Sequence, residues 1–253
     1  MSLVEHFSHE YRFLPGIAPY SCGVVSSPGF EIVSVTFQRP IEYRAGFQRI
    51  DQYLATEGRA RNALCAIALR SPRPFTFAGF GVFNGLYASI LEGWGLFVNG
   101  VNPIARTNVA PVINPPSTPV LYGFSYTRPC TSSLPQTFVV AGAGELPEGE
   151  LTRNEIVALG QTSADGLATK ARFVMDLMES RLKGLGAGWN EVTTVNVYTA
   201  HSLSPIILPE IILGRVGPIS GHGTTWHFSR PPIEEIEYEM DLHGVRTELR
   251  IGQ

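Results

Sequence analysis

Arg106 is the residue whose type and surroundings best suit the binding of a small acid. It begins the segment Arg106-Thr107-Asn108-Val109 and precedes Pro115 by nine positions (115 − 106). A guanidinium stays charged, and its planar fork can meet a carboxylate with two parallel hydrogen bonds. The sequence therefore predicts a carboxylate anchor at Arg106. The alternative is a surface arginine whose stem packs on apolar neighbours.

A run of acidic residues near the C-terminal end supplies candidates for proton transfer: Glu234, Glu235, Glu237, Glu239 and Asp241. The last four are spaced by two, so on one strand they would share a face. Such a face could simply be solvated and discourage edge pairing. If one acid is instead buried in a pocket, its raised pKa suits it to move protons. We select Glu239 as that acid.

Four further residues are candidates for contact with a substrate. His222 lies between two glycines and could shuttle a proton, or it could be a hydrogen-bonded histidine at a strand edge. Because His227 is an odd five positions away, the two rings would lie on opposite faces of a strand, which disfavours a shared metal. Tyr20 could bind through its hydroxyl or simply pack its ring. Gly142 and Thr224 complete the predicted substrate-binding set.

The bulk composition excludes several other classes of protein. The chain has 253 residues, 44% of them hydrophobic and 16% charged, with a formal net charge of −3. The basic residues are scattered, so nucleic-acid binding is not expected, and no apolar run approaches the ~20 residues of a membrane span. The glycines of 141–144 lack the GxGxxG spacing of a nucleotide site, and we expect no cofactor and no metal. Three widely separated cysteines and the lack of a signal peptide predict a soluble cytoplasmic protein.

Periodicity divides the chain into two similar series of elements. A period of 3.6 predicts helices and β-branched or apolar runs predict strands. In the first half we expect a β-hairpin of strands 21–27 and 31–37 around Pro28-Gly29, helix 44–57, strand 63–69, helix 80–98, and strands 106–113 and 118–126. In the second half we expect strand 136–141, helix 164–183, strand 191–199, a short helix at 207–214, and strands 222–228 and 234–242. The stretch 127–135 has a linker's composition.

The order and spacing of these segments resemble the RidA/YjgF family. In the second half the similarity lies in the glycine-ended strand 139–144, the segment 184–199 and the closing segment 230–242. In the first half it lies in Ile17-Ala18-Pro19-Tyr20-Ser21 and in the Arg106…Pro115 pattern. The resemblance implies an α+β chorismate-mutase-like fold in two tandem units, residues 1–127 and 128–253, each a mixed sheet covered by two helices.

The resemblance also implies a function and an assembly. Family members hold an enamine or imine acid with the arginine and position a hydrolytic water with a glutamate. Here the first unit has Gly123 at the place of the acid, and the second has His222 at the place of the arginine. A composite site using Arg106 and Glu239 would restore the pair, and Arg128 is the predicted second cation for a two-carboxylate substrate. These features imply a metal-free deaminase of the 2-aminomuconate type and a homotrimer of tandem chains.

Two other functions stay open at this point. The split signature could reflect decay to a non-catalytic protein that binds a small acid or a partner protein. A related scaffold could also hydrolyse chorismate.

Overall fold

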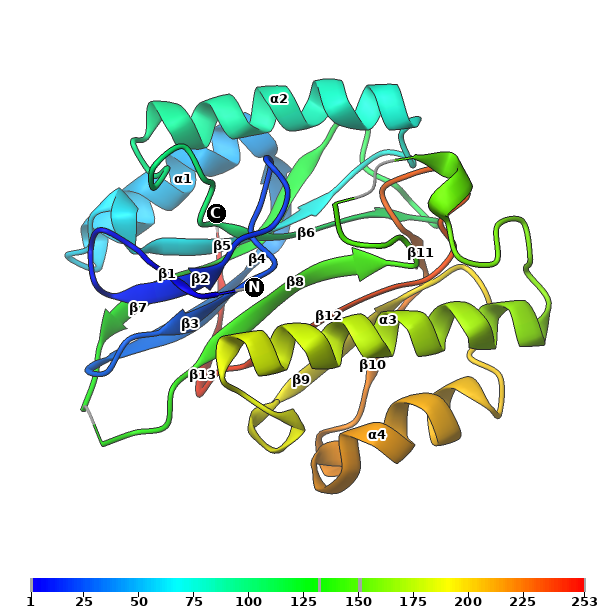
Figure 1. Ribbon diagram of the computed structural model, residues 1–253. Coiled ribbons are helices and arrows are strands. Elements are labelled where there is room, and N and C mark those ends of the chain that lie inside the picture. Colours follow the sequence, from blue (N-terminus) through cyan, green and yellow to red (C-terminus); the bar gives the residue numbers. More distant parts are fainter. Residues whose placement is uncertain (1, 132, 150–151, 253) are drawn as a thin grey trace.

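The computed structural model describes residues 2–131, 133–149 and 152–252 and places two β-sheets between two layers of helices. In Figure 1, α1 and α2 cover one sheet on its outer side, and α3 and α4 lie on the opposite side of the molecule. The helices are α1 (Tyr43–Thr56), α2 (Phe77–Gly93), α3 (Ala164–Leu185), the π-helix η4 (Ile207–Leu213) and α4 (Gly214–Val216); short 3₁₀ turns are η1 (Arg61–Ala63), η2 (Arg153–Glu155), η3 (Trp189–Glu191) and η5 (Gly217–His222).

Thirteen strands are present in the described part of the chain. They are β1 (Val4–Glu5), β2 (Tyr11–Leu14), β3 (Gly23–Ser26), β4 (Phe30–Glu42), β5 (Leu64–Arg70), β6 (Ala105–Pro111), β7 (Val120–Pro129), β8 (Phe138–Gly144), β9 (Thr194–Tyr198), β10 (Thr225–His227), β11 (Ser229–Arg230), β12 (Glu239–Gly244) and β13 (Thr247–Ile251). We call the seven-stranded sheet β1-β2-β3-β8-β12-β9-β10 the first sheet and the six-stranded sheet β11-β6-β5-β7-β4-β13 the second sheet. The fold class is therefore mixed α+β.

The centres of the two sheets have the same topology. In the second sheet the order β6-β5-β7-β4 combines one parallel pair, β5 with β6, and two antiparallel pairs. In the first sheet the order β10-β9-β12-β8 combines the parallel pair β9 with β10 and two antiparallel pairs. In both sheets the chain passes through these four strands in the same sequence, with a helix after the first and the second.

Each half of the chain also adds strands to the sheet of the other half. β3 from the first half pairs with β8, whereas β13 from the end of the second half runs parallel to β4. The predicted hairpin of strands 21–27 and 31–37 is therefore wrong. Both strands exist, but Pro28-Gly29 carries the chain from one sheet to the other, and β4 pairs with β7 instead of β3. A turn dipeptide marks a change of direction, and the partner of each strand is decided by distant residues.

Helix α3 shows why the local predictions succeed elsewhere. The hydroxyl of Ser163 accepts a hydrogen bond from Gly166 N at 3.2 Å, and Gly186 ends the helix in the left-handed conformation at φ 75°. Val174, Met175 and their apolar neighbours along the helix are buried against the first sheet. Full burial of such side chains contributes about 1.5–3 kcal/mol each. α1 and α2 cover the second sheet with a separate apolar cluster that includes Phe47 and Tyr87.

A third apolar cluster lies where the two sheets face each other. It contains Phe13 and Ala141 from the first sheet and Ile32 and Ala105 from the second. This contact fixes β6 next to β8, which is what brings the two halves together at the site described below. None of the helices in residues 2–131, 133–149 and 152–252 combines the length and the apolar character that a membrane span requires.

Candidate active site

The predicted residues Tyr20, Arg106, Gly142 and Glu239 line one cavity of about 180 Å³. They come from four separate segments: the loop before β3, β6, β8 and the start of β12. Thus the cavity combines the arginine of the first half with the acid of the second, as the composite-site prediction requires. We call it the active-site cavity. Its other lining residues include Cys22, Phe80, Asn108, Glu148 and Arg181.

Arg106 is a buried cation without an acidic partner among the described residues. Its guanidinium carbon lies 4.5 Å from the ring centre of Tyr20 and 4.8 Å from that of Tyr87, and Phe80 lies at 5.5 Å. Only 3% of the residue is exposed, and Nη1 has no hydrogen-bond partner in the described part of the chain. Burial lowers the pKa of Arg106 from its usual value, although it remains a strong base. An unpaired guanidinium among aromatic rings is well suited to receive an anion.

Asn108 adds a second free donor on the same face of β6. It lies two positions after Arg106, so both side chains point the same way from the strand. Its Oδ1 accepts a hydrogen bond from the Ser71 hydroxyl at 2.9 Å, while its buried Nδ2 has no partner within the described residues. This residue belongs to the Arg106-Thr-Asn-Val pattern, and its spacing alone could have identified it.

Glu239 is the buried acid that the sequence analysis sought. The residue is 4% exposed, and its carboxylate makes no side-chain hydrogen bond or ion pair with any described residue. Desolvation raises its pKa well above the usual value; Asp241 raises it further, and Arg106 opposes the shift. A buried carboxyl group whose pKa is raised holds a proton more tightly than an exposed glutamate, which suits it to act as a general acid or base.

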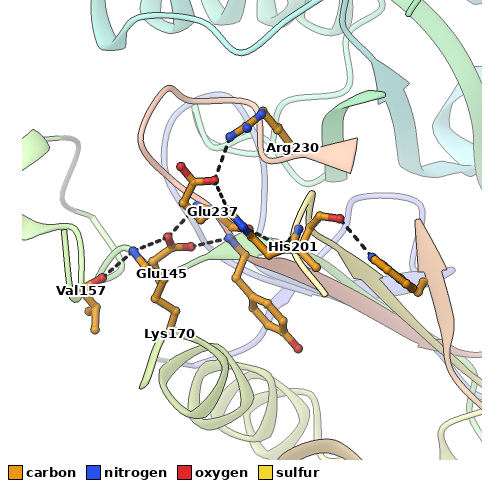
Figure 2. Close-up of polar contacts among 9 residues, drawn as sticks. Glu145, Val157, Lys170, His201, Arg230 and Glu237 are labelled. Atoms are coloured by element: carbon orange, nitrogen blue, oxygen red, sulfur yellow. Dashed lines mark hydrogen bonds and ion pairs between the residues drawn. The ribbon is translucent and has the colours of Figure 1, made fainter. Parts of the chain in front are cut away.

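Glu235 and Glu237 precede β12 and form ion pairs outside the cavity. The prediction that four acids share one strand face is therefore wrong. β12 begins only at Glu239, and Glu235 lies before it in the left-handed conformation at φ 70°. Glu235 forms an exposed ion pair with Arg153. Glu237 pairs with His201 at 2.9 Å and Arg230 at 2.8 Å (Figure 2). Glu239 and Asp241 are the members of the run that share a strand face.

A buried ion pair holds the backbone just before Glu239. Glu145 and Lys170 are both fully buried, with Oε1 and Nζ 2.9 Å apart. The same carboxylate accepts a hydrogen bond from the backbone N–H of Glu237 at 2.7 Å (Figure 2). It also accepts one from the backbone N–H of Tyr238 at 3.0 Å. Lys170 also donates to the carbonyl of Val157 at 3.0 Å. This arrangement ties α3 to the segment that delivers Glu239 to the cavity.

Arg181 is the cation that the sequence analysis missed. It projects from α3 into the cavity, where its Nε donates to Glu148 at 2.6 Å and its Nη1 donates to the carbonyl of Ala141 at 2.9 Å. Burial lowers its pKa, but Cys22 and Glu148 outweigh that effect and the net shift is upward. A signal was present in the sequence, because Arg181 falls three residues after Met178 on the apolar stripe of α3.

Tyr20 lies between these charged groups. Burial raises the pKa of its hydroxyl, Arg106 and Arg181 counteract this, and Glu239 adds to it. The backbone around it is fixed because Asn102 Nδ2 donates to the carbonyl of Pro19 at 2.8 Å. Tyr20 thus stays a neutral hydrogen-bond donor at neutral pH, close to both arginines and the acid.

Three predicted residues do not line this cavity. Arg128, the predicted second cation, forms an ion pair with Glu31 at 2.8 Å near the end of β7. His222 is exposed at the end of η5, which is a 3₁₀ turn and not a strand. Thr224 follows it in a loop. The strand expected at 222–228 extends only over Thr225–His227, and this shortening takes His222 and Thr224 away from the sheet.

Gly142 leaves the space that the Glu239 carboxylate occupies. A Cβ atom at this position would collide with Glu239 Oε1 and approach the Thr107 hydroxyl at 3.2 Å. We expect Gly142→Ala to displace the carboxylate and lower kcat by more than about tenfold, with a Tm change of only a few degrees. Gly188→Ala is the matched control, because a Cβ there has its nearest neighbour at 3.4 Å, a normal van der Waals contact. Steady-state kinetics and thermal melting check both variants; equal kcat in the two would contradict the expectation.

Comparison with known proteins identifies the family. The chain matches the family model of 2-aminomuconate deaminase CnbZ over residues 3–249. It is 41% identical over 240 residues to a 2-amino-5-chloromuconate deaminase of Comamonas testosteroni, covering 94% of each chain. Among solved structures it is similar to a chorismatase crystal structure, with a TM-score of 0.44 and 11% identity over 88% of this chain and 77% of the other. The chain therefore belongs to the 2-aminomuconate deaminase CnbZ family and is a deaminase.

Proposed function

We propose that the protein hydrolyses the C–N bond of a substituted 2-aminomuconate, using side chains of the active-site cavity. The observation that carries this proposal is the pairing of an unpartnered buried guanidinium, Arg106, with an unpartnered buried carboxyl group, Glu239. The family match and the chloromuconate-deaminating relative support the same substrate class.

The proposed reaction begins with the enamine form of the substrate bound to Arg106 through the carboxylate next to the amino carbon. Tautomerisation, in which the far end of the enamine gains a proton and the nitrogen loses one, gives the imine, and a water molecule then adds to the imine carbon. Glu239 accepts one proton as the water adds and returns it to the nitrogen, which gives a carbinolamine. It then carries the remaining hydroxyl proton to the same nitrogen, so that the C=O bond forms, the C–N bond breaks and ammonia leaves. One imine and one water give one 2-oxo acid and one ammonia. Tyr20 donates a hydrogen bond to the developing oxygen.

Arg181 is the proposed partner of the second carboxylate. Its Nη2 has no hydrogen-bond partner among the described residues, whereas Nε and Nη1 are held by Glu148 and backbone carbonyls. Because the rest of the guanidinium is already held in place, Nη2 can bind a ligand with little further loss of side-chain conformational entropy. It thereby replaces Arg128 in the role that the sequence analysis gave to a second cation.

The proposed function is tested by following ammonia and 2-oxo acid release from 2-aminomuconate and its 5-chloro derivative. We expect the two products in equal amounts with the native protein. In Arg106→Ala the rate should fall below a tenth, because the anchoring ion pair is lost. If the native protein releases no ammonia from either compound, the proposed function is wrong.

The role of Arg181 gives a separate prediction. Arg181→Lys keeps the charge but loses the fork, and we expect kcat/KM for the dicarboxylate to fall about 10- to 100-fold, the worth of one or two charge-assisted hydrogen bonds. For a dehydroamino acid with a single carboxylate, kcat/KM should change less than about threefold. An equal loss on both substrates would show that Arg181 acts on the structure of the cavity instead.

We also propose that residues 1–127 and 128–253 derive from two fused RidA/YjgF-like units and that three chains associate. The shared strand order of the two sheets supports the fusion. A composite cavity built from both halves fits a family whose sites lie between subunits. Light scattering tests the assembly: a mass three times that of the chain is expected, and a monomer would rule out the trimer.

The free cysteines Cys22, Cys65 and Cys130 fit a reducing, cytoplasmic location.

A further inference from the structure

A second cavity, of about 270 Å³, lies between the two sheets. Its walls come from β4, β5, β6 and β7 of the second sheet and from β8, β9, β10 and β12 of the first, with β13 at one side. We call it the intersheet cavity. Among its lining residues, Arg106 is the one that it shares with the active-site cavity. The proposed reaction uses none of its other residues.

Arg70 is the second buried cation that lines this cavity, besides the shared Arg106. It is 6% exposed and lies at the end of β5, with its guanidinium carbon 4.0 Å from the ring centre of Tyr122 and 5.5 Å from that of Tyr198. Its Nη1 donates to the carbonyl of Leu69 at 2.9 Å. No acidic side chain within the described residues forms an ion pair with it. A buried charge without a counter-charge is unfavourable, and an entering anion would offset that cost.

One acid that lines this cavity is held by neighbouring polar side chains. Asp241 accepts a hydrogen bond from Asn196 Nδ2 at 2.8 Å and another from the Tyr198 hydroxyl at 2.9 Å, which uses both of its oxygens. The ring of His227 stacks on Tyr198 with centres 4.7 Å apart, and its Nε2 lies 3.2 Å from Asn196 Oδ1. Burial and the nearby Arg70 lower the pKa of His227, so this ring is neutral at pH 7. Arg70 therefore forms no ion pair with any described residue of this cluster.

The remaining walls favour a flat ligand. Tyr122 and Tyr198 present rings beside the guanidinium. The paired residues Ala68 of β5 and Gly123 of β7 add small residues to the walls. A planar body can lie along aromatic rings with favourable stacking, while its charged end meets an arginine in the same plane.

We propose that the intersheet cavity is a second binding site for a small planar carboxylate, held by Arg70 and stacked beside Tyr122 and Tyr198. This proposal does not depend on the deaminase reaction, because its readout is binding. A ligand at this site would contact β6, the strand that carries Arg106, through the shared wall of the two cavities.

The test is a calorimetric titration with benzoate, a planar carboxylate that cannot be deaminated. We expect two binding events per chain in the native protein. Arg106→Ala should weaken binding in the active-site cavity at least tenfold, so that its event is no longer detected. Arg70→Met should do the same for the event in the intersheet cavity. The double variant should bind no benzoate. Arg172→Met is the matched control, since Arg172 is exposed on α3 and lines neither cavity. It should keep both events.

A second variant separates loss of the ligand from loss of the fold. Ala68→Leu keeps Arg70 but fills part of the cavity, so it should also abolish one event while circular dichroism and ammonia release stay near native. A native protein whose only binding event is lost in Arg106→Ala and kept in Arg70→Met overturns the proposal. So does the persistence of both events in Arg70→Met or, if that variant does not fold, in Ala68→Leu. If the intersheet cavity binds no benzoate but the native protein still releases ammonia, the second-site proposal fails and the proposed deaminase function stands.

Discussion

Replacement of Glu239 by glutamine is expected to lower kcat by about 10²- to 10⁴-fold, the usual contribution of a positioned general acid or base. The amide has nearly the same shape, so it should fill the space beside Gly142 without displacing neighbours. It cannot accept the proton of the attacking water. KM should change little, because Arg106 and Arg181 remain. Steady-state kinetics on 2-aminomuconate measure both constants.

Glu234→Gln is the matched control for this prediction. Glu234 belongs to the same acidic run but is exposed and lines neither cavity. Its variant should retain kcat within about twofold. If Glu239→Gln retained native kcat, the carboxyl group would have no part in the chemistry, and the proposed role of Glu239 would have to be abandoned.

The same residue links activity and stability to pH. Desolvation raises the pKa of Glu239 in the folded protein above its unfolded value, so the folded state binds the proton more tightly. The resulting stabilisation is fully present below the unfolded pKa and is lost as pH rises through the folded pKa. Activity that requires the ionised acid should rise over that same upper range. Glu239→Gln should remove both trends and melt at a higher temperature than the native protein at pH 7.

Lys170→Met is expected to destabilise the fold by about 3–5 kcal/mol, because it leaves the Glu145 carboxylate buried without its counter-charge. For a chain of this size that corresponds to a fall in Tm of roughly 6–20 °C. The variant also loosens the clamp on Glu237 and Tyr238, so kcat measured well below Tm should fall as well. Chemical denaturation and thermal melting measure the first effect, and kinetics measures the second.

Lys183→Met on the same helix provides the comparison. Lys183 pairs with Glu179 at 2.7 Å, but its side chain is 73% exposed. Exposed pairs contribute about 0–1 kcal/mol, so this variant should melt close to the native temperature. The double variant Lys170→Met/Glu145→Gln should recover part of the lost stability, because the uncompensated charge is removed. Equal stability of the two lysine variants would mean that the buried pair does not support the fold.

The sequence predicts best those features that are set by neighbouring residues. Helix α3 was predicted from its apolar stripe and Ser163, and the structure extends it by two residues, to Leu185. Arg106 and Glu239 were predicted to act together although 133 positions separate them (239 − 106), and the cavity brings them together. That prediction came from a family pattern divided between the halves, which is information that periodicity does not contain.

The features that failed depend on contacts between distant segments. The hairpin at Pro28-Gly29 was inferred from a turn, but β3 and β4 join different sheets. Arg128 was chosen as the second cation for its type, whereas β7 directs it to Glu31. The apolar stripe of α3 does not predict Arg181 and Lys170, because the periodicity of apolar residues says nothing about a charged side chain within the stripe. A charged residue within such a stripe has to meet a buried partner or a ligand, and both do so here.

The parallel pairing of β13 with β4 has a consequence for biosynthesis. Val33 lies opposite Thr247, and Phe37 lies opposite Ile251, so the second sheet gains this strand only when residues 247–251 have left the ribosome. Until then one flank of β4 presents open hydrogen-bonding groups over a 13-residue strand. Pairing across more than 200 positions is slow to form. The nascent first half is therefore expected to depend on chaperone protection, and a chain truncated before Thr247 should accumulate in inclusion bodies.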